Sequence, residues 1–582
     1  MTDRVRWGRG LAPLALVGAI VLYPLGVLLV QIFFPDVFAF QPSGRFSLDA
    51  FHALAQDPLF WSSLKDSLVL SLAVAATATA LGAVVGHLVV RVRLWRPGVW
   101  NALLWLLFFA PSFMLAEGIM LFAIQGGVAS GLGIWSQGLS QIVFSPLGVG
   151  LVLTIKLMPY AAITVSSALQ AVGQEYDDAA RSLGASGWSR LRRVHLPLVR
   201  GALWASFAII FAEAVSDFGV SSTLAASAHF PMIPYAIYSA LNFVPVNFSG
   251  AAVQSLLLIA LALAVQLPQV LAARGAQRVM HGHRRQWRLP ARVNGWATAS
   301  LAAFFFLALG LPLVSFLLWA LVPDVGLGFA PSHWTLQSFA ALLGSDIYTG
   351  GAALRSYVLA LLAAGLTTGL GIWVMWAGSR LSALYDTLLT ATIAVPGIVL
   401  AAAYVFAWNA PWVQGTPLAL YGTYGVLVLV YVAGGLPYSA RLARVALNQV
   451  DQGMERAVLS LGGSSTKALV HVTLPLIRPM VVSTFLLIFT GVFFELPASS
   501  LLYPPGDPTI AVAIVHQFHN VAYSVGAALS IVSVLLLGAT LGVFRLLDHS
   551  TRQPWREARK EVEYTAEAAE RLQVLQRTAD TV

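Results

Sequence analysis

The chain has 582 residues, of which 58% are hydrophobic and 10% are charged, and its formal net charge is +9. Soluble domains carry roughly 25% charged residues, so this composition excludes a water-soluble globular protein and indicates a membrane protein. The absence of Cys excludes disulfides, thiolate metal sites and a Cys nucleophile.

Long apolar segments run through the whole chain. A helix needs about 20 mainly apolar residues to span a bilayer. In chain order, the segments that meet this requirement are 11–34, 66–90, 99–124, 147–170, 201–223, 249–273, 296–321, 354–377, 384–408, 422–446, 480–500 and 524–547. We therefore expect an all-α membrane protein with twelve transmembrane helices.

Basic residues alternate between the two sides of the expected membrane. One set of connecting segments carries Arg or Lys: 1–10, 91–98, 171–200, 274–295, 378–383, 447–479 and 548–582. The opposite set contains no Arg or Lys in segments 125–146, 224–248, 322–353, 409–421 and 501–523. Its first segment, between the first two expected spans, is the exception and carries Arg45 and Lys65. Because cytoplasmic loops carry the excess of Arg and Lys, both termini are expected in the cytoplasm. The same distribution accounts for the net charge, so we expect no nucleic-acid partner.

An internal repeat relates the two parts of the chain at one constant sequence offset. Three motifs recur at this offset: Met158–Tyr160 with Leu436–Tyr438, Ser182–Ser186 with Ser460–Ser464, and Leu196–Leu198 with Leu474–Leu476. They predict two homologous six-span halves, 1–273 and 296–547, joined by a basic cytoplasmic linker at 274–295 and followed by a cytoplasmic helical tail at 548–582. Equal orientation relates the halves by a pseudo-two-fold axis along the membrane normal, with a pathway at their interface.

The two matched cytoplasmic loops have an unusual plan. In Gln174–Arg200, acidic residues come first and Arg181 follows, as a helix start favours, and Gly184 can end that helix. Trp188–Val194 is long enough for a short second helix, and Leu196–Pro197 is expected to end it before the next span. The second loop, Asp451–Arg478, has the same plan.

These loops resemble the cytoplasmic loop of binding-protein-dependent ABC importer permeases. The motif residues of the first copy are Asp178, Ala179, Ala180, Gly184, Leu196 and Pro197. The second copy keeps Gly462, Leu474 and Pro475 but departs at the start, where Ala457 is retained, Arg456 replaces the acid and Glu455 comes one position early. The resemblance implies that the short helix of each loop couples to an ATPase subunit.

The same resemblance implies the partners and the mechanism. Two copies of a cytoplasmic ATPase subunit hold ATP and Mg, and a periplasmic binding protein delivers the cargo to a permease in the bacterial inner membrane, which works by alternating access. The chain has no Gly-x-x-x-x-Gly-Lys-Ser/Thr sequence, so we expect a transport subunit that hydrolyses no ATP and binds no cofactor itself.

Ionisable residues inside spans are costly and are therefore functional candidates. The pathway candidates are Glu117, Glu213, Asp217 and Glu495, of which the last two are separated by the offset of the repeat. Acids favour a cation, and no Lys or Arg is expected at matched depth. The alternative for Asp217 and Glu495 is that each only caps a helix end. Two prolines, Pro111 and Pro396, predict matched kinks in the third and ninth spans, which line the pathway or serve packing.

Segments 217–220 and 495–502, together with the fused architecture, resemble the ferric-iron permeases, which implies ferric iron as cargo. Relatives that carry polyamine, thiamine or phosphonate share the fold, so these three cargoes remain alternatives to iron. An ion-driven secondary transporter is the alternative class of protein. His516 and His519 could form a metal site with Glu495, but we interpret them as loop residues at the outer face and assign no metal site.

Overall fold

The computed structural model describes residues 12–38, 44–171, 174–276, 292–323, 328–344, 350–377, 385, 388–389 and 392–544. The N-terminal arginines, most of the linker 274–295, Arg380 and the tail 548–582 lie outside the described residues. All regular structure in the described part is helical.

Eleven helices of the described part are long and apolar enough to cross a membrane. They are Ala12–Phe33, Pro58–Arg91, Ser112–Gly131, Pro146–Ala171, Gly187–Ala225, Phe248–Val265, Gly295–Leu321, Ala352–Ala377, Tyr424–Leu447, Ser465–Phe493 and Tyr523–Phe544. Each overlaps one expected span. The remaining expected span, 384–408, lies partly outside the described residues and ends in α21 (Gly397–Trp408). Large apolar side chains such as Leu72, Leu362 and Leu535 are at least half exposed, as expected for a lipid-facing surface.

The third span is broken rather than kinked. α5 (Pro97–Phe109) ends before Ala110–Pro111, and α6 (Ser112–Ala123) starts again after it. Pro111 has no N–H to continue the helix ladder, and its extended backbone separates the two helices. Pro396 precedes α21 with the same extended backbone, so the third and ninth spans are interrupted in the same way.

The dipeptide Leu196–Pro197 does not end the short helix, contrary to the prediction. α11 (Gly187–Arg190) continues through a wider π turn into α12 (Leu196–Ser216), and the N–H of Leu196 donates to the carbonyl of Leu191. The wider turn accommodates the missing N–H of Pro197 without a break. In the second copy, Pro475 follows the same kind of turn, between α24 (Ser465–Ala468) and α25 (Leu474–Phe493).

Each half is built on a tightly packed group of helices. α4 (Pro58–Arg91) packs on α9 (Pro146–Ala171) and α12, while α19 (Ala352–Ala377) packs on α22 (Tyr424–Leu447) and α25. Glycines allow the closest approaches, because a Cβ on Gly82 would collide with the backbone at Met158 and one on Gly371 would collide with Ser439. The same contact therefore recurs in both halves of this all-α membrane protein.

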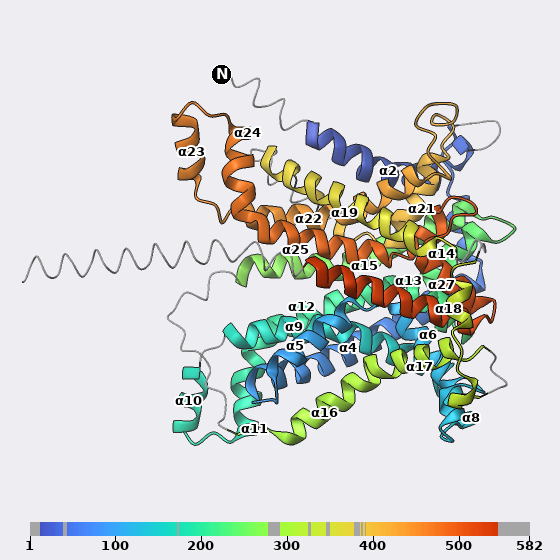
Figure 1. Ribbon diagram of the computed structural model, residues 1–582. Helices are drawn as coiled ribbons and strands as arrows, with labels where there is room; N and C mark the ends of the chain where they lie inside the picture. The colour runs from blue at the N-terminus through green and yellow to red at the C-terminus, as the bar shows by residue number, and fades with distance from the viewer. Residues whose placement is uncertain are drawn as a thin grey trace, which may run out of the picture.

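The first span of each half crosses to the other half (Figure 1). α2 (Tyr23–Phe33) packs on α21, and α17 (Leu311–Leu321) packs on α6. Buried side chains fix both crossings: the hydroxyl of Tyr404 donates to Ile20 O at 2.6 Å, and Nε1 of Trp319 donates to Leu121 O at 3.1 Å. The two halves thus interlock around a shared interface.

Both matched loops project from the same end of the molecule (Figure 1). α10 (Gln174–Ser182) with α11, and α23 (Gln452–Ser460) with α24, lie at this end, which we call the loop end. α14 (Ile233–Asn242) and α27 (Ile510–His519) lie toward the opposite end, where Ser67 and Ser356 hydroxyls accept hydrogen bonds from the N–H groups of Ile233 and Ile510.

Candidate functional site

A left-handed glycine separates the two helices of each loop, as predicted. Gly184 has φ of 76° and Gly462 has φ of 82°, a conformation that favours glycine at a helix C-terminus. Serine then starts each short helix: Ser186 Oγ accepts a hydrogen bond from Ser189 N–H at 3.3 Å, and Ser464 Oγ accepts one from Lys467 N–H at 3.2 Å. The predicted order of helix, glycine break and short helix is therefore present in both copies.

The tips of both loops expose apolar side chains. Leu183 is 87% exposed and Leu461, its counterpart in the internal repeat, is 88% exposed. Trp188, which lies in the same loop as Leu183, is 70% exposed. The motif residues Ala179, Gly184, Leu196, Pro197, Glu455, Ala457, Gly462 and Pro475 are exposed as well, and Asp178, Ala180 and Leu474 are partly exposed. Exposed apolar side chains next to a polar rim are typical of a docking surface.

A buried carboxylate that the sequence did not reveal joins the two helices of the first loop to each other and to the turn that leads into α12. Asp177 lies 2.9 Å from Arg181 Nε, 3.0 Å from Arg190 Nε and 3.3 Å from His195 Nε2, and it is 2% exposed. The spacing Asp177–Arg181 was the available signal. At the four matched positions the second loop has Glu455, Leu459, Ala468 and Thr473, and Glu455 is exposed. The ionic cluster is therefore a property of the first loop.

A central cavity of about 470 Å³ lies between the two halves. Its lining comes from both: Pro111, Ser112, Phe113, Ala212, Glu213, Ser216, Asp217, Phe218, Gly219, Ala262, Ile393, Ala394, Val395, Pro396, Gly397, Tyr438, Gly491, Phe494, Glu495, Leu496 and Pro497. Both broken spans open onto this cavity, and three of the four candidate acids line it.

Asp217 and Glu495 both line the cavity and cap the helix that follows. Oδ1 of Asp217 accepts a hydrogen bond from Val220 N–H at 2.7 Å, and Ser112 also bonds this carboxylate. Oε1 of Glu495 accepts one from Ala498 N–H at 2.7 Å, while Oε2 accepts one from Ser499 Oγ at 2.7 Å. The capping alternative therefore describes their geometry correctly, and it does not exclude a role at the cavity surface.

Glu213 is exposed to the cavity one helical turn before Asp217. Its carboxylate is hydrogen-bonded by Tyr160, and Tyr438 from the other half lies within electrostatic range of it. The expectation of no basic residue at this depth is wrong. Lys156 lies within electrostatic range of Glu213 and Asp217, and its Nζ donates to Phe108 O at 2.7 Å, a carbonyl near the end of the broken helix α5.

The internal repeat shows that this group of charges belongs to one half only. The position that matches Lys156 is Gly434, and the position that matches Glu213 is Gly491. In contrast, Tyr160 keeps its counterpart Tyr438, and Asp217 keeps an acidic counterpart. The repeat thus keeps both tyrosines and both capping acids, but only Tyr438 of the two tyrosines lines the cavity, and Glu213 has no acidic counterpart.

Glu117 is not part of the cavity. It lies on α6 and is fully buried, and neither carboxylate oxygen has a hydrogen-bond partner. The adjacent Gly118 packs against Pro312 of α17, so Glu117 is close to the crossing between the halves. The structure therefore separates it from the other three candidates.

The two histidines near the opposite end make contacts with residues other than Glu495. His519 Nε2 donates to the carbonyl of Ser222 at 3.0 Å and so connects α27 to the first half. Nδ2 of Asn520 lies 3.1 Å from the His516 ring nitrogens. Within the described residues, no three His, Cys, Asp or Glu side chains are grouped so that they could hold a metal.

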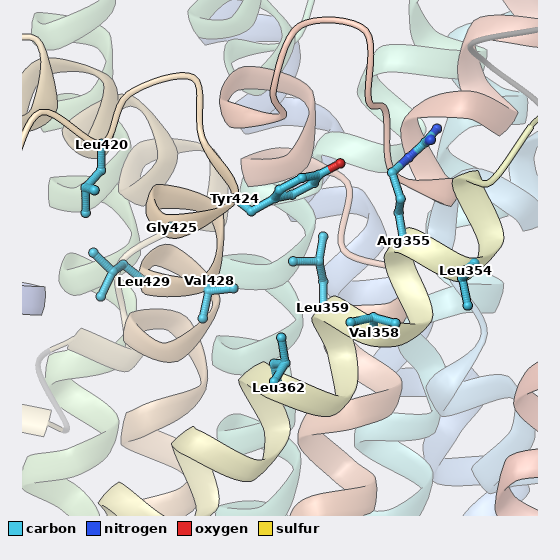
Figure 2. Close-up of a pocket in the computed structure, with 10 residues that line it drawn as sticks. All are labelled: Leu354, Arg355, Val358, Leu359, Leu362, Leu420, Tyr424, Gly425, Val428 and Leu429. Atoms are coloured by element: carbon cyan, nitrogen blue, oxygen red, sulfur yellow. The ribbon is translucent and has the colours of Figure 1, made fainter.

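A larger pocket of about 720 Å³ lies between α19 and α22 in the second half. Figure 2 shows apolar side chains from these helices around it, with the guanidinium of Arg355 extending away from them. Arg355 forms an ion pair with Asp507, at 3.4 Å between Nη1 and Oδ1, and its Nε donates a hydrogen bond to Pro508 O at 3.1 Å. Because Leu354 and Leu362 on its wall are exposed at membrane depth, this pocket belongs to the lipid-facing surface.

Comparison with protein families gives one match that occurs twice. The family described as "Binding-protein-dependent transport system inner membrane component" matches residues 78–277 and 356–553. Each match contains one of the loops, α10–α11 or α23–α24.

Curated proteins show similarity over longer segments. A Haemophilus influenzae permease named for ferric transport is 24% identical over 394 residues, which are 65% of this chain and 60% of that protein. A ferric transport system permease protein of Actinobacillus pleuropneumoniae is 23% identical over 430 residues, 71% of this chain and 60% of that protein. The chain thus spans 60% of the length of these relatives. A Salmonella paratyphi A permease named for 2-aminoethylphosphonate transport is 28% identical over 256 residues, 43% of this chain and 92% of that protein.

Proposed function

Because the chain belongs to the family of binding-protein-dependent transport system inner membrane components, we propose that it is the permease subunit of an ATP-driven importer. The observation that carries this proposal is the pair of matched loops at one end of the molecule, each with a leucine almost fully exposed at its tip. Because this exposed leucine recurs at the matched position of both loops, each loop is suited to insert into a groove of a partner.

The partner is a cytoplasmic ATPase subunit in two copies, one for each loop. ATP and Mg are held by that subunit. The loop end faces the cytoplasm, with both termini on the same side, in agreement with the basic residues of the loops and their near absence from the opposite connections. The opposite end then receives cargo from a periplasmic binding protein.

Transport proceeds by alternating access. The cavity lies at the interface of two interlocked bundles, and each bundle carries its own loop. When the ATPase dimer closes, the two loops approach and the bundles change between two packings, which opens the cavity first to one side and then to the other. The broken spans and the helix breaks after α12 and α25 place backbone and side-chain polar groups at the cavity instead of lipid.

The cargo is ferric iron. Carboxylate oxygen is the preferred ligand of hard, highly charged cations, and three carboxylates line the cavity against one nearby ammonium group. A water molecule occupies about 30 Å³, so a cavity of 470 Å³ has room for an ion with a hydration shell or a small chelator. The relatives named for ferric transport match over 394 and 430 residues, more than either half contains, so the similarity to them extends across both halves.

The test is reconstitution of the chain in liposomes with its ATPase and a binding protein loaded with ferric iron. We expect ATP hydrolysis and iron uptake to rise together, and both to be absent without the ATPase. Uptake without the ATPase would indicate a secondary transporter. Stimulation by a binding protein loaded with spermidine, thiamine or 2-aminoethylphosphonate, but not with iron, would overturn the cargo assignment.

A further inference from the structure

Glu213 interacts with two matched tyrosines, one from each half, and both Glu213 and Tyr438 line the cavity. Tyr160 and Tyr438 occupy the same position in the two halves, each directly after a proline inside a spanning helix. Tyr438 lines the cavity and is 44% exposed, which is high for a phenol on a membrane-spanning helix. Such a residue faces either lipid or a pathway, and the cavity lining assigns it to the pathway.

The carboxylate of Glu213 interacts with the phenol groups of both Tyr160 and Tyr438. Tyr160 lies within interaction range of it in the first half, and Tyr438 lies within electrostatic range of it from the second half. In the second half, the position that matches Glu213 is Gly491, which lines the cavity and adds no side chain. The acid that faces Tyr438 therefore comes across the interface, and Gly491 leaves the space in front of it open.

We propose that Tyr160, Glu213 and Tyr438 form a binding site for a hard, multivalent cation at the interface between the halves. Phenol and carboxylate oxygens are hard donors, and such donors select highly charged metal ions over softer ones. The identification of this ligand as the transported cargo rests on the proposed function.

The charges around the site agree with a cation. Glu213 lies on α12 and Asp217 lies one turn later, just after the helix ends, and Lys156 is within electrostatic range of both. On the second-half side, Arg441 lies within electrostatic range of Tyr438. Two carboxylates against one ammonium leave the first-half wall negative. Because the Lys156 ammonium is bound to Phe108 O, it stands at the end of α5 as a fixed partial counter-charge. A partial counter-charge keeps binding weak enough for the ion to leave, as a transport pathway requires.

The site also has a mechanical consequence. Its donors come from α9 and α12 in the first half and from α22 in the second half. When the halves change their packing, the distance between Tyr438 and Glu213 changes, so the same motion that opens the cavity alters the donor set. Binding of the ion is thereby coupled to the arrangement of the halves.

The experiment uses the purified full-length chain in nanodiscs, titrated with ferric citrate. When ferric iron binds a tyrosine oxygen, the phenol proton is released to the solvent, and the resulting iron–phenolate bond produces a visible ligand-to-metal charge-transfer band that reports on tyrosine directly. We expect the band in the native chain, a weaker band with about tenfold lower iron affinity in Y160F and Y438F, and no band in the double variant. E213Q should lower the affinity similarly, and Glu213→Asp should restore part of it.

Tyr235→Phe is the matched control, because the ring of Tyr235 on α14 stacks on that of Tyr238, and Tyr235 is not among the groups that act on Glu213. The proposal is overturned if the native chain shows no band, or if Y160F and Y438F keep the native band and affinity, which would mean adventitious iron only. Failure of the proposed function is seen separately, in liposomes, as a lack of iron-dependent ATP hydrolysis. If the chain shows a band that depends on the two tyrosines but no iron-dependent ATP hydrolysis, the metal site is supported and the assignment of its ligand as the cargo is wrong.

Discussion

Asp217 and Glu495 occupy matched positions of the two halves, and each carboxylate caps the next helix with a hydrogen bond of 2.7 Å while lining one cavity. The two acids therefore stabilise helix ends and are also positioned to contact cargo in the cavity. These roles can be separated experimentally, since an amide caps a helix nearly as well as a carboxylate but carries no charge.

The first prediction separates charge from capping at these acids. D217N keeps an oxygen that can accept from Val220 N–H, so we expect normal folding and thermal stability. E495Q keeps one oxygen for Ala498 N–H but loses the acceptor of Ser499 N–H, so we expect normal folding with a small loss of thermal stability. Loss of the charge should lower uptake of a cationic cargo about tenfold in proteoliposomes. D217A, which removes both charge and cap, should in addition lower stability by about 1 kcal/mol. Unchanged uptake in D217N and E495Q would assign these residues to capping alone.

The second prediction concerns the left-handed glycines of the loops. A β-branched residue at a positive φ costs about 1–2 kcal/mol, so G184V and G462V should shift the loop away from its native conformation. No neighbouring atom lies within 4 Å of a Cβ at either position, so the effect should stay local and membrane insertion should be normal. We expect ATP hydrolysis that is no longer accompanied by uptake, measured in the reconstituted complex.

Gly187→Ala is the control for the loop glycines. Gly187 lies in the same loop with open space around it but without a positive φ. Coupling should be native in this variant. Equal loss of coupling in G187A and G184V would contradict the conformational explanation.

The third prediction uses the difference between the two loops. Asp177 is buried among Arg181, Arg190 and His195, and removal of its charge leaves these groups without their counter-charge. Breaking a buried ionic group by removing one partner typically costs about 3–5 kcal/mol. D177N should therefore increase hydrogen exchange in 174–195, measured by mass spectrometry. E455Q, at the matched exposed position of the second loop, should leave exchange in 452–473 unchanged. Equal responses in both loops would refute the asymmetry.

The spans and the loop plan could be predicted from the sequence because they depend on local features. Apolar length determines the spans, and a glycine followed by a serine cap determines the break in each loop. The internal repeat then predicted that both loops share one end. In contrast, the continuation of the helix through Pro197 depends on a π turn whose wider hydrogen bond has no composition signal.

The site could be predicted only in part, since its residues are isolated in the sequence. Glu117, Glu213 and Asp217 are alike as acids within apolar runs, yet Glu117 lies away from the cavity and the other two line it. Lys156 is a single basic residue in a span, and only the packing of α9 against α5 and α12 brings it near the acids. The shared position of Tyr160 and Tyr438 was visible as a repeat, but their common partner was not.

The fourth prediction tests the interlocking of the halves. Gly118 on α6 faces α17 of the other half, and a Cβ there would lie 2.5 Å from Cβ and 2.7 Å from Cα of Pro312. Because the obstacle includes backbone, G118V must move α17 outward, and overpacking of this kind costs about 1–3 kcal/mol. We expect a lower midpoint of thermal unfolding in nanodiscs and reduced uptake, since α6 starts at Ser112 in the cavity wall. G365V in α19, where no atom lies within 4 Å of a Cβ, should match the native chain. If both variants unfold at the same temperature, the α6–α17 crossing does not carry the contact between the halves.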